Sequence, residues 1–300
     1  MKYFITGTSG FIGKHLVKKL LKIKSNIIFS ADKQILDYKH KRLIHEVCDL
    51  KTKKDFPDVD IVVHLAAYNG TKYFYKKPLD VVKDNILPTI NLVDHYSKKK
   101  LKWFIYAGSP ESIAGATDFF HLPLPSKESY PFVFHGVKNK RWSYGSSKSL
   151  SEQYVMFSEL NYKILRYHNV YGPGQNDHFI PDFIENVRRG KPKLYGYKNT
   201  RSFMYIEDAI DATMKVIQSN KITKEIINIG VNFEISILTV AKIICKLMKV
   251  SYKKIVLKDH PIGSVKRRCP DVTKLDNIIK FTPRYSLQKG LKKTINAFEK

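Results

Sequence analysis

The stretch Thr6-Gly7-Thr8-Ser9-Gly10-Phe11-Ile12-Gly13 decides the fold class, because it follows a predicted strand over residues 2–6 and opens a predicted helix. Gly7 permits a tight turn, Gly10 lets the backbone approach a pyrophosphate, and Gly13 lets the helix pack closely on the strand. The N-terminus of the helix adds N–H donors and a partial positive charge that suit phosphate. We therefore predict that a dinucleotide binds at this loop through Gly7, Gly10, Phe11, Ile12 and Gly13.

An acidic residue after the second predicted strand, residues 26–31, indicates which dinucleotide binds. Asp32 stands about 20 residues beyond Gly13, where such folds place the carboxylate that binds the adenosine ribose. A carboxylate there accepts hydrogen bonds from the ribose hydroxyls and repels a 2′-phosphate. The sequence therefore favours NAD over NADP.

The order of elements predicts an α/β protein. Further strands are expected over residues 60–65, 102–107 and 162–167, and amphipathic helical stretches separate them. This alternation is typical of a Rossmann-type, doubly wound parallel sheet. After Gly172-Pro-Gly174 the elements become shorter, and we assign them to a smaller C-terminal substrate-binding lobe. We expect the NAD-binding domain to span 1–170, with 203–230 returning to it, and the lobe to span 171–202 and 231–300.

Two local signals predict how particular helices begin or bend. Ser236 precedes apolar residues at helical spacing, so it should cap a helix that starts at Ile237. Pro88 lies inside the helical pattern of residues 81–93, where it predicts a kink or a late helix start.

The composition limits the location and the partners of the protein. The formal net charge is +26, yet only nine of the 53 basic residues are Arg, and the Lys residues are scattered over helix faces. This distribution does not favour nucleic acid, although a positive field attracts anionic substrates. No apolar run is long enough to span a bilayer, and a strand rather than a signal peptide begins the chain. Cys48, Cys245 and Cys269 are widely spaced, so we expect a reduced cytoplasmic protein without disulfides or a metal site.

The segment Tyr144-Gly-Ser-Ser-Lys148 places a phenol and an ammonium one helical turn apart. Tyr with an ordinary pKa of about 10 needs about 4 kcal/mol of help to ionise at neutral pH. One cation about 5 Å away supplies around 3 kcal/mol at an effective dielectric near 20. Lys148 together with the nicotinamide cation would suffice, so we predict Tyr144 as a catalytic base and Lys148 as its activator.

The ordered motifs resemble those of the extended short-chain dehydrogenase/reductases that act on nucleotide-linked sugars, the NAD-dependent epimerase/dehydratase group. The G-x-x-G-x-x-G spacing, the Tyr-Lys pair and Asn85 all match. The resemblance implies cofactor contacts from Asp49, Leu50, Leu65, Ala66, Ala67 and Lys148. It also implies a homodimer built from helices near 80–97 and 144–160.

Three further motifs resemble the segments with which this family binds the substrate. They are Arg166-Tyr-His-Asn-Val-Tyr-Gly-Pro, Arg201-Ser-Phe-Met-Tyr-Ile-Glu-Asp and Arg267-Arg268 with Asp271 and Lys274. The resemblance implies that Asn169, Arg201 and Arg268 contact the diphosphate of a nucleotide-sugar. Arg suits bidentate phosphate binding, and Arg is the scarce cation in this chain.

The segment Ala107-Gly-Ser-Pro-Glu-Ser-Ile-Ala-Gly115 corresponds to the Ser/Thr-rich end of a strand in this family. Ser109 aligns with the hydroxyl that binds the sugar's 4-oxygen. Glu111 aligns with a catalytic carboxylate of 4,6-dehydratases and UDP-glucuronate decarboxylases, whereas Pro110 replaces the Asp of dTDP-glucose 4,6-dehydratases. Because Ala114 replaces the usual Tyr and the motif is one residue longer, Ser112 is the alternative substrate-binding hydroxyl.

The reaction implied by this resemblance begins with oxidation of the sugar at C4. Elimination or decarboxylation then follows, and the alternative is 4-epimerisation. A different class of function, a non-catalytic NAD- or RNA-binding scaffold, has its support in the charge.

Overall fold

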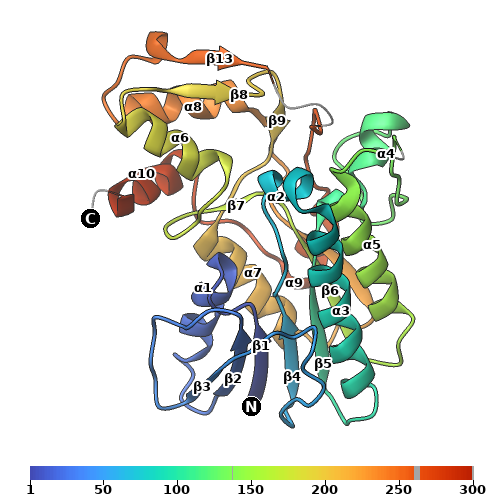
Figure 1. The fold of residues 1–300 in the computed structure, drawn as a ribbon. Helices are drawn as coiled ribbons and strands as arrows, with labels where there is room; N and C mark the ends of the chain where they lie inside the picture. The colour runs from blue at the N-terminus through green and yellow to red at the C-terminus, as the bar shows by residue number, and fades with distance from the viewer. Residues whose placement is uncertain (137, 260–263, 299–300) are drawn as a thin grey trace. The chain divides into compact units, whose positions relative to one another are not determined.

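A seven-stranded sheet organises the computed structural model, which describes residues 1–136, 138–259 and 264–298 (Figure 1). Its strands lie in the order β11-β6-β5-β4-β1-β2-β3. They are β1 (Lys2–Thr6), β2 (Ile27–Asp32), β3 (Leu43–Val47), β4 (Ile61–His64), β5 (Trp103–Gly108), β6 (Tyr162–Tyr167) and β11 (Glu225–Ile229). The predicted Rossmann-type parallel sheet is therefore confirmed.

The strand order reverses at β1, which pairs in parallel with β2 on one side and with β4 on the other. Because βαβ crossovers are right-handed, the helices that follow β1 and β4 lie on opposite faces of the sheet. The first of these is α1 (Phe11–Leu20), and the second is α3 (Pro78–Tyr96), which is preceded by the short α2 (Thr71–Lys76). Helix α5 (Trp142–Met156) packs along α3 (Figure 1).

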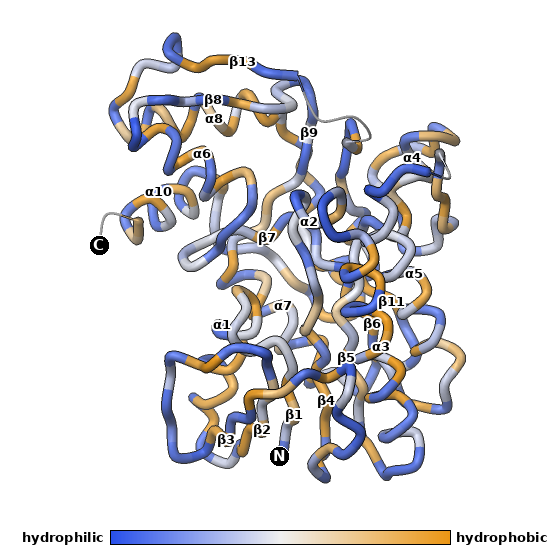
Figure 2. The backbone as a smooth tube through the Cα atoms, viewed as in Figure 1, coloured by the Kyte–Doolittle hydropathy of each residue, from blue (hydrophilic) through white to orange (hydrophobic). Residues whose placement is uncertain are grey.

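The core lies along the central strands, whose side chains are buried on both faces. Phe4, Val62, Phe104 and Ile164 come from four neighbouring strands and are at most 1% exposed. Burying each such side chain stabilises the fold by about 1.5–3 kcal/mol. Figure 2 shows the contrast between these hydrophobic strands and the hydrophilic connection from β2 to β3.

The expected strands before β11 are confirmed within one or two residues, but the sequence analysis missed β3. This strand is at the edge of the sheet and leaves Ile44 and Val47 more than half exposed, so its sequence carries little burial signal.

The Ser236 cap is confirmed, since its hydroxyl accepts a hydrogen bond from the Thr239 N–H. The late start proposed for the helix around Pro88 is wrong. Helix α3 begins at Pro78, at a first-turn position that suits proline.

The chain divides into two compact units. Unit 1 comprises 1–112, 136–167 and 210–227, and unit 2 comprises 113–135, 168–209 and 228–300. The sequence analysis placed 113–135 in the first domain. The assignment of NAD to one domain and substrate to the other stays a prediction.

Unit 2 contains short strand pairs and several helices. The pairs are β10 (Met204–Tyr205) with β7 (Val170–Tyr171), β12 (Ile235–Ser236) with β9 (Thr200–Arg201), and β13 (Val256–Lys258) with β8 (Lys193–Tyr195). The helices are α4 (Ala114–Phe119), α6 (Phe179–Arg188), α8 (Ile237–Leu247), α9 (Thr273–Ile279) and α10 (Leu287–Phe298), and α7 (Ile206–Gln218) runs from this unit into unit 1. None of the described helices has the length and apolar character needed to cross a bilayer.

Lys163 on β6 is a fully buried cation that binds the carbonyl oxygens at the C-terminus of α7. Its ammonium donates to the carbonyl oxygens of Val216 at 2.9 Å and Ser219 at 2.6 Å, and it lies 3.6 Å from the centre of the Trp103 ring. A cation at this position satisfies carbonyls that a helix leaves without donors at its C-terminus. Burial lowers the pKa of Lys163 to about 8, and the side chain remains mostly protonated at neutral pH.

We expect Lys163→Met to lower the free energy of unfolding by about 1–3 kcal/mol, because the buried carbonyls at the end of α7 lose their donor. Urea denaturation measures the change. Lys102→Met is the matched control, since Lys102 is exposed at the start of the neighbouring strand and should have little effect. Equal stability of Lys163→Met and the unchanged protein would show that the ammonium does not cap α7.

Candidate active site

The residues predicted to bind the cofactor follow the C-terminal ends of adjacent parallel strands. The glycine loop follows β1, Asp32 ends β2, Asp49 and Leu50 follow β3, and Leu65, Ala66 and Ala67 follow β4. In open parallel sheets, ligands bind at this edge, next to the point where the strand order reverses. The fold therefore brings these predicted residues to one edge of the sheet in unit 1.

Gly7 and Gly13 in the glycine loop leave no space for a larger side chain. A Cβ on Gly7, whose φ is +74°, would lie 2.6 Å from the Ala66 nitrogen, and a Cβ on Gly13 would lie 2.1 Å from the Gly7 oxygen. Beside these glycines, the Thr8 hydroxyl is buried and has no hydrogen-bond partner among the described residues. Such an orphaned polar group fits a loop that receives the phosphates of a bound ligand.

Asp32 is oriented by backbone donors. One carboxylate oxygen accepts from the Ser9 N–H at 2.9 Å and the other from the Gln34 N–H at 3.1 Å. The adjacent Lys33 pairs with Asp84 at 2.9 Å and with Asp49 at 3.3 Å, so its charge is balanced by carboxylates. The carboxylate next to the glycine loop fits the adenosine ribose of NAD.

Tyr144 and Lys148 lie on α5, as predicted. The Lys148 ammonium donates to the Ala107 carbonyl at 2.8 Å and to the Tyr106 hydroxyl at 3.3 Å. Burial lowers its pKa to about 8, and the nearby Glu152 carboxylate opposes the shift. The Tyr144 ring is 7% exposed and stacks on Phe74 with 4.8 Å between centroids. Lys148 thus stays cationic at neutral pH one helical turn from a fixed phenol, the arrangement that tyrosinate formation requires.

The two candidate hydroxyls after β5 have different surroundings. Ser112 is fully buried, and its hydroxyl donates to the Ser109 carbonyl at 2.6 Å and to Glu152 at 3.4 Å. The Ser109 hydroxyl accepts from the Glu111 N–H at 3.2 Å, which leaves its own proton available to a ligand. These contacts favour Ser109 over Ser112 as the hydroxyl that faces substrate.

Glu152 and Arg166 form an ion pair beneath these serines. The side chains are 0% and 1% exposed, and their nearest charged atoms are 2.7 Å apart. Glu152 also accepts from the Ser109 N–H at 3.3 Å. A Cβ on Gly108 would lie 2.5 Å from a Glu152 oxygen, so a larger residue at the end of the strand would displace the carboxylate that pairs with Arg166.

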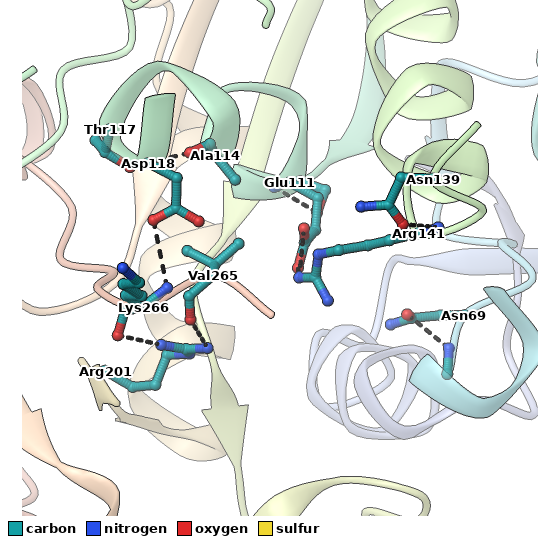
Figure 3. Close-up of polar contacts among 12 residues, drawn as sticks. Asn69, Glu111, Ala114, Thr117, Asp118, Asn139, Arg141, Arg201, Val265 and Lys266 are labelled. Carbon is teal, nitrogen blue, oxygen red and sulfur yellow. Dashed lines mark hydrogen bonds and ion pairs between the residues drawn. The ribbon is translucent and has the colours of Figure 1, made fainter. Parts of the chain in front are cut away.

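Glu111 is paired with a cation. Its two carboxylate oxygens accept from the same terminal nitrogen of Arg141, at 2.8 and 2.9 Å (Figure 3). Burial works against the charge of Arg141, but the Glu111 carboxylate and the Tyr75 hydroxyl outweigh it and raise the pKa of the guanidinium. Glu111 is therefore held by an ion pair.

The predicted phosphate-binding residues of unit 2 are brought together around Ser202. The Asn169 amide donates to the Ser202 carbonyl at 3.0 Å, and the Ser202 N–H donates to the Arg268 carbonyl at 3.0 Å. The Arg201 guanidinium donates to the carbonyls of Val265 at 2.6 Å and Lys266 at 3.2 Å (Figure 3). Hydrogen bonds thus join Asn169, Arg201 and Arg268, which come from two stretches of the chain, into one cluster of unit 2.

The sequence analysis did not assign roles to Arg141 and Glu152. Glu152 stands four residues after Lys148, on the same helix face, and that spacing was the available signal. Arg141 is the N-cap residue of α5 and stands three residues before Tyr144, but its partner is 30 residues earlier in the chain. A single sequence does not show such a pairing.

Comparison with known proteins gives the family. The sequence profile of the NAD-dependent epimerase/dehydratase family matches residues 3–230. The chain belongs to this family. The UDP-N-acetyl-alpha-D-glucosaminuronate decarboxylase of Bacillus cytotoxicus is 32% identical to it over 98% of this chain and 96% of the relative. The human dTDP-D-glucose 4,6-dehydratase is 28% identical over 98% of this chain and 89% of the relative.

Solved structures agree with this membership. The UDP-glucuronic acid 4-epimerase of Bacillus cereus, in complex with UDP-glucuronic acid and NAD, superposes on the chain with a TM-score of 0.87. The two chains are 26% identical, and the match covers 100% of this chain and 99% of the other. Decarboxylases, dehydratases and epimerases are therefore all among the relatives of this NAD-dependent family member.

We expect Asp32→Ala to weaken NAD binding and to remove most of the discrimination against NADP, because no carboxylate then repels the 2′-phosphate. Fluorescence titration with both nucleotides measures the two affinities. Asp32→Glu is the control, since it keeps the charge and both acceptor oxygens and should retain the preference for NAD. Tighter binding of NADP than of NAD by the unchanged protein would contradict the role of Asp32.

Proposed function

We propose that this protein oxidises a nucleotide-linked hexuronic acid at C4 and then removes its carboxyl group as carbon dioxide. The ion pair of Glu111 with Arg141 is the observation that carries the proposal. A carboxylate is expected at this position in dehydratases and decarboxylases alike, and one that a guanidinium holds is less suited to remove the C5 proton that elimination requires. The relative with 32% identity over nearly the whole chain is named as a decarboxylase of a UDP-linked hexuronic acid. NAD, when bound, would accept hydride from C4 of the sugar and later return it.

Tyr144 is the proposed base for the oxidation. It takes the proton of the C4 hydroxyl, and the Lys148 cation stabilises the tyrosinate that does so. Ser109 donates a hydrogen bond to the C4 oxygen and so holds that carbon in place, with Ser112 as the alternative hydroxyl. Asn169, Arg201 and Arg268 are proposed to bind the diphosphate.

The ketone at C4 makes the next step possible. The C6 carboxylate is then β to a carbonyl, so the C5–C6 bond can break without a base. Carbon dioxide leaves, the electron pair passes into the C4–C5 enolate, and C5 takes up a proton. Reduction at C4 would complete a cycle.

Two other outcomes start from a 4-keto sugar. On a hexose that carries a hydroxyl at C6, elimination of water across C5–C6 requires a base at C5, for which Glu111 is the candidate, and gives a 4,6-dehydratase. Return of hydride to the opposite face gives a 4-epimerase, which the structural similarity to an epimerase supports. A non-catalytic scaffold would explain the charge of +26 but not the buried, charge-balanced surroundings of Tyr144 and Lys148.

Mass spectrometry of the products distinguishes these reactions. We expect UDP-linked hexuronic acids to lose the mass of carbon dioxide, whereas epimerisation would leave their mass unchanged. A 4,6-dehydratase would instead remove the mass of water from a nucleotide-linked hexose, which carries a hydroxyl at C6. Tyr144→Phe should lower turnover at least about 10²-fold, because the proton acceptor is lost, while NAD affinity stays nearly constant. Products that retain the full mass, across UDP-, dTDP-, GDP- and CDP-linked hexuronic acids, would refute decarboxylation.

We also propose that the protein is a homodimer formed through α3 and α5. Leu150 and Tyr154 of α5 and its C-cap residue Phe157 are 50%, 37% and 80% exposed. Leu79 and Leu87 of α3 are 73% and 40% exposed. Burying such side chains against a second copy would contribute about 1.5–3 kcal/mol each. An exposed apolar face on two packed helices favours self-association.

We expect Phe157→Glu to convert the dimer into monomers, because a carboxylate would be buried in the interface. Light scattering at micromolar concentration measures the mass. Phe233→Glu is the control, since Phe233 is 62% exposed on unit 2, and this variant should stay dimeric. A monomeric mass for the unchanged protein would refute the dimer.

A further inference from the structure

A cluster of two lysines and two aspartates lies at the edge of the sheet where NAD is expected to bind. Lys33 directly follows Asp32 at the end of β2, Asp49 and Lys51 follow β3, and Asp84 comes from α3. Each lysine pairs with both aspartates. The cluster therefore joins three segments of unit 1 next to the carboxylate that is predicted to bind the adenosine ribose.

Asp84 is the main partner of both lysines. Its two oxygens lie 2.9 Å from the Lys33 ammonium and 2.5 Å from the Lys51 ammonium. The nearest Asp49 oxygen is farther away, at 3.3 Å from Lys33 and 3.6 Å from Lys51. The hydrogen bond that Lys51 donates to Asp84 outweighs desolvation and raises the pKa of Lys51. A single carboxylate on α3 thus holds two cations.

Lysines in this part of the chain have the chemistry that NADP would require. NADP differs from NAD by a phosphate on the 2′-oxygen of the adenosine ribose, and a cation near that oxygen accommodates it. Lys33 is the residue next to Asp32, and its side chain is half exposed. It could therefore turn towards a 2′-phosphate if its carboxylate partner were removed.

We propose that Asp84 is a positioning residue for the choice of cofactor. It pairs with Lys33 and Lys51, keeps both cations away from a 2′-phosphate and so reinforces the preference for NAD. Asp32 repels that phosphate directly, whereas Asp84 acts through the lysines. Cofactor choice is independent of the reaction that follows at the sugar.

Asp84→Asn tests this role, because it removes one charge and nearly keeps the volume of the side chain. A cation about 5 Å from a phosphate near a protein surface can change an affinity by about tenfold. We therefore expect the affinity for NADP to rise about tenfold, while the affinity for NAD stays within about twofold. Fluorescence titration of the full chain with each nucleotide measures both affinities.

Three further variants separate this role from a structural one. Asp84→Glu keeps a carboxylate on α3 and should retain the preference of the unchanged protein. Lys33→Met in the Asp84→Asn background should remove most of the gained NADP affinity, because the nearer of the freed cations is then absent. Asp80→Asn removes the same charge from an exposed position one turn earlier in α3 and should leave both affinities unchanged.

The ratio of the NADP and NAD affinities decides the outcome. An unchanged ratio in Asp84→Asn, or in Asp84→Ser should the first variant not fold, would overturn the role of Asp84. An equal rise in Asp80→Asn would overturn it as well, since net charge alone would then explain the effect. So would a rise in Asp84→Asn that persists when Lys33→Met and Lys51→Met are added.

Discussion

The buried ion pair between Glu152 and Arg166 is the interaction on which the arrangement of unit 1 depends. It joins α5 to β6, and through the Ser109 N–H and the Ser112 hydroxyl it also fixes the turn that follows β5. Removing one member would leave an uncompensated charge in the interior, which costs about 3–5 kcal/mol. Because Glu152 is one turn beyond Lys148 on the same helix, the ion pair that joins α5 to β6 also fixes the position of Lys148, the proposed activator of Tyr144.

Two ion pairs thus contact the same short turn from different positions along α5. Glu152 reaches it from within the helix, and Arg141 reaches it from the N-cap position. Glu152 accepts from the Ser109 N–H, and Arg141 pairs with Glu111. Two groups on or beside α5 therefore hold the turn after β5.

The sequence predicted those parts of the molecule in which local pattern and function coincide. The glycine loop, Asp32 at the end of β2 and the Tyr144-Lys148 pair each carry their signal within a few residues, and the structure places them on the elements expected. The edge strand β3 escaped prediction because most of its side chains face solvent. The roles of Glu152, Arg166 and Arg141 depend on pairing between elements distant in the chain, and the choice between Ser109 and Ser112 depends on which hydroxyl is already bonded. These pairings and hydrogen bonds form only when the elements pack together.

Arg201, a proposed diphosphate contact, is held in place by the protein before any ligand binds. Its guanidinium is already fixed by backbone carbonyls from two segments of unit 2. A long side chain that a ligand must immobilise subtracts about 0.5–1.5 kcal/mol from the affinity. In Arg201 this loss of freedom occurs on folding and not on binding. As a proposed diphosphate contact, Arg201 would act alike on nucleotide-sugars of every base, and discrimination among them would fall to other groups.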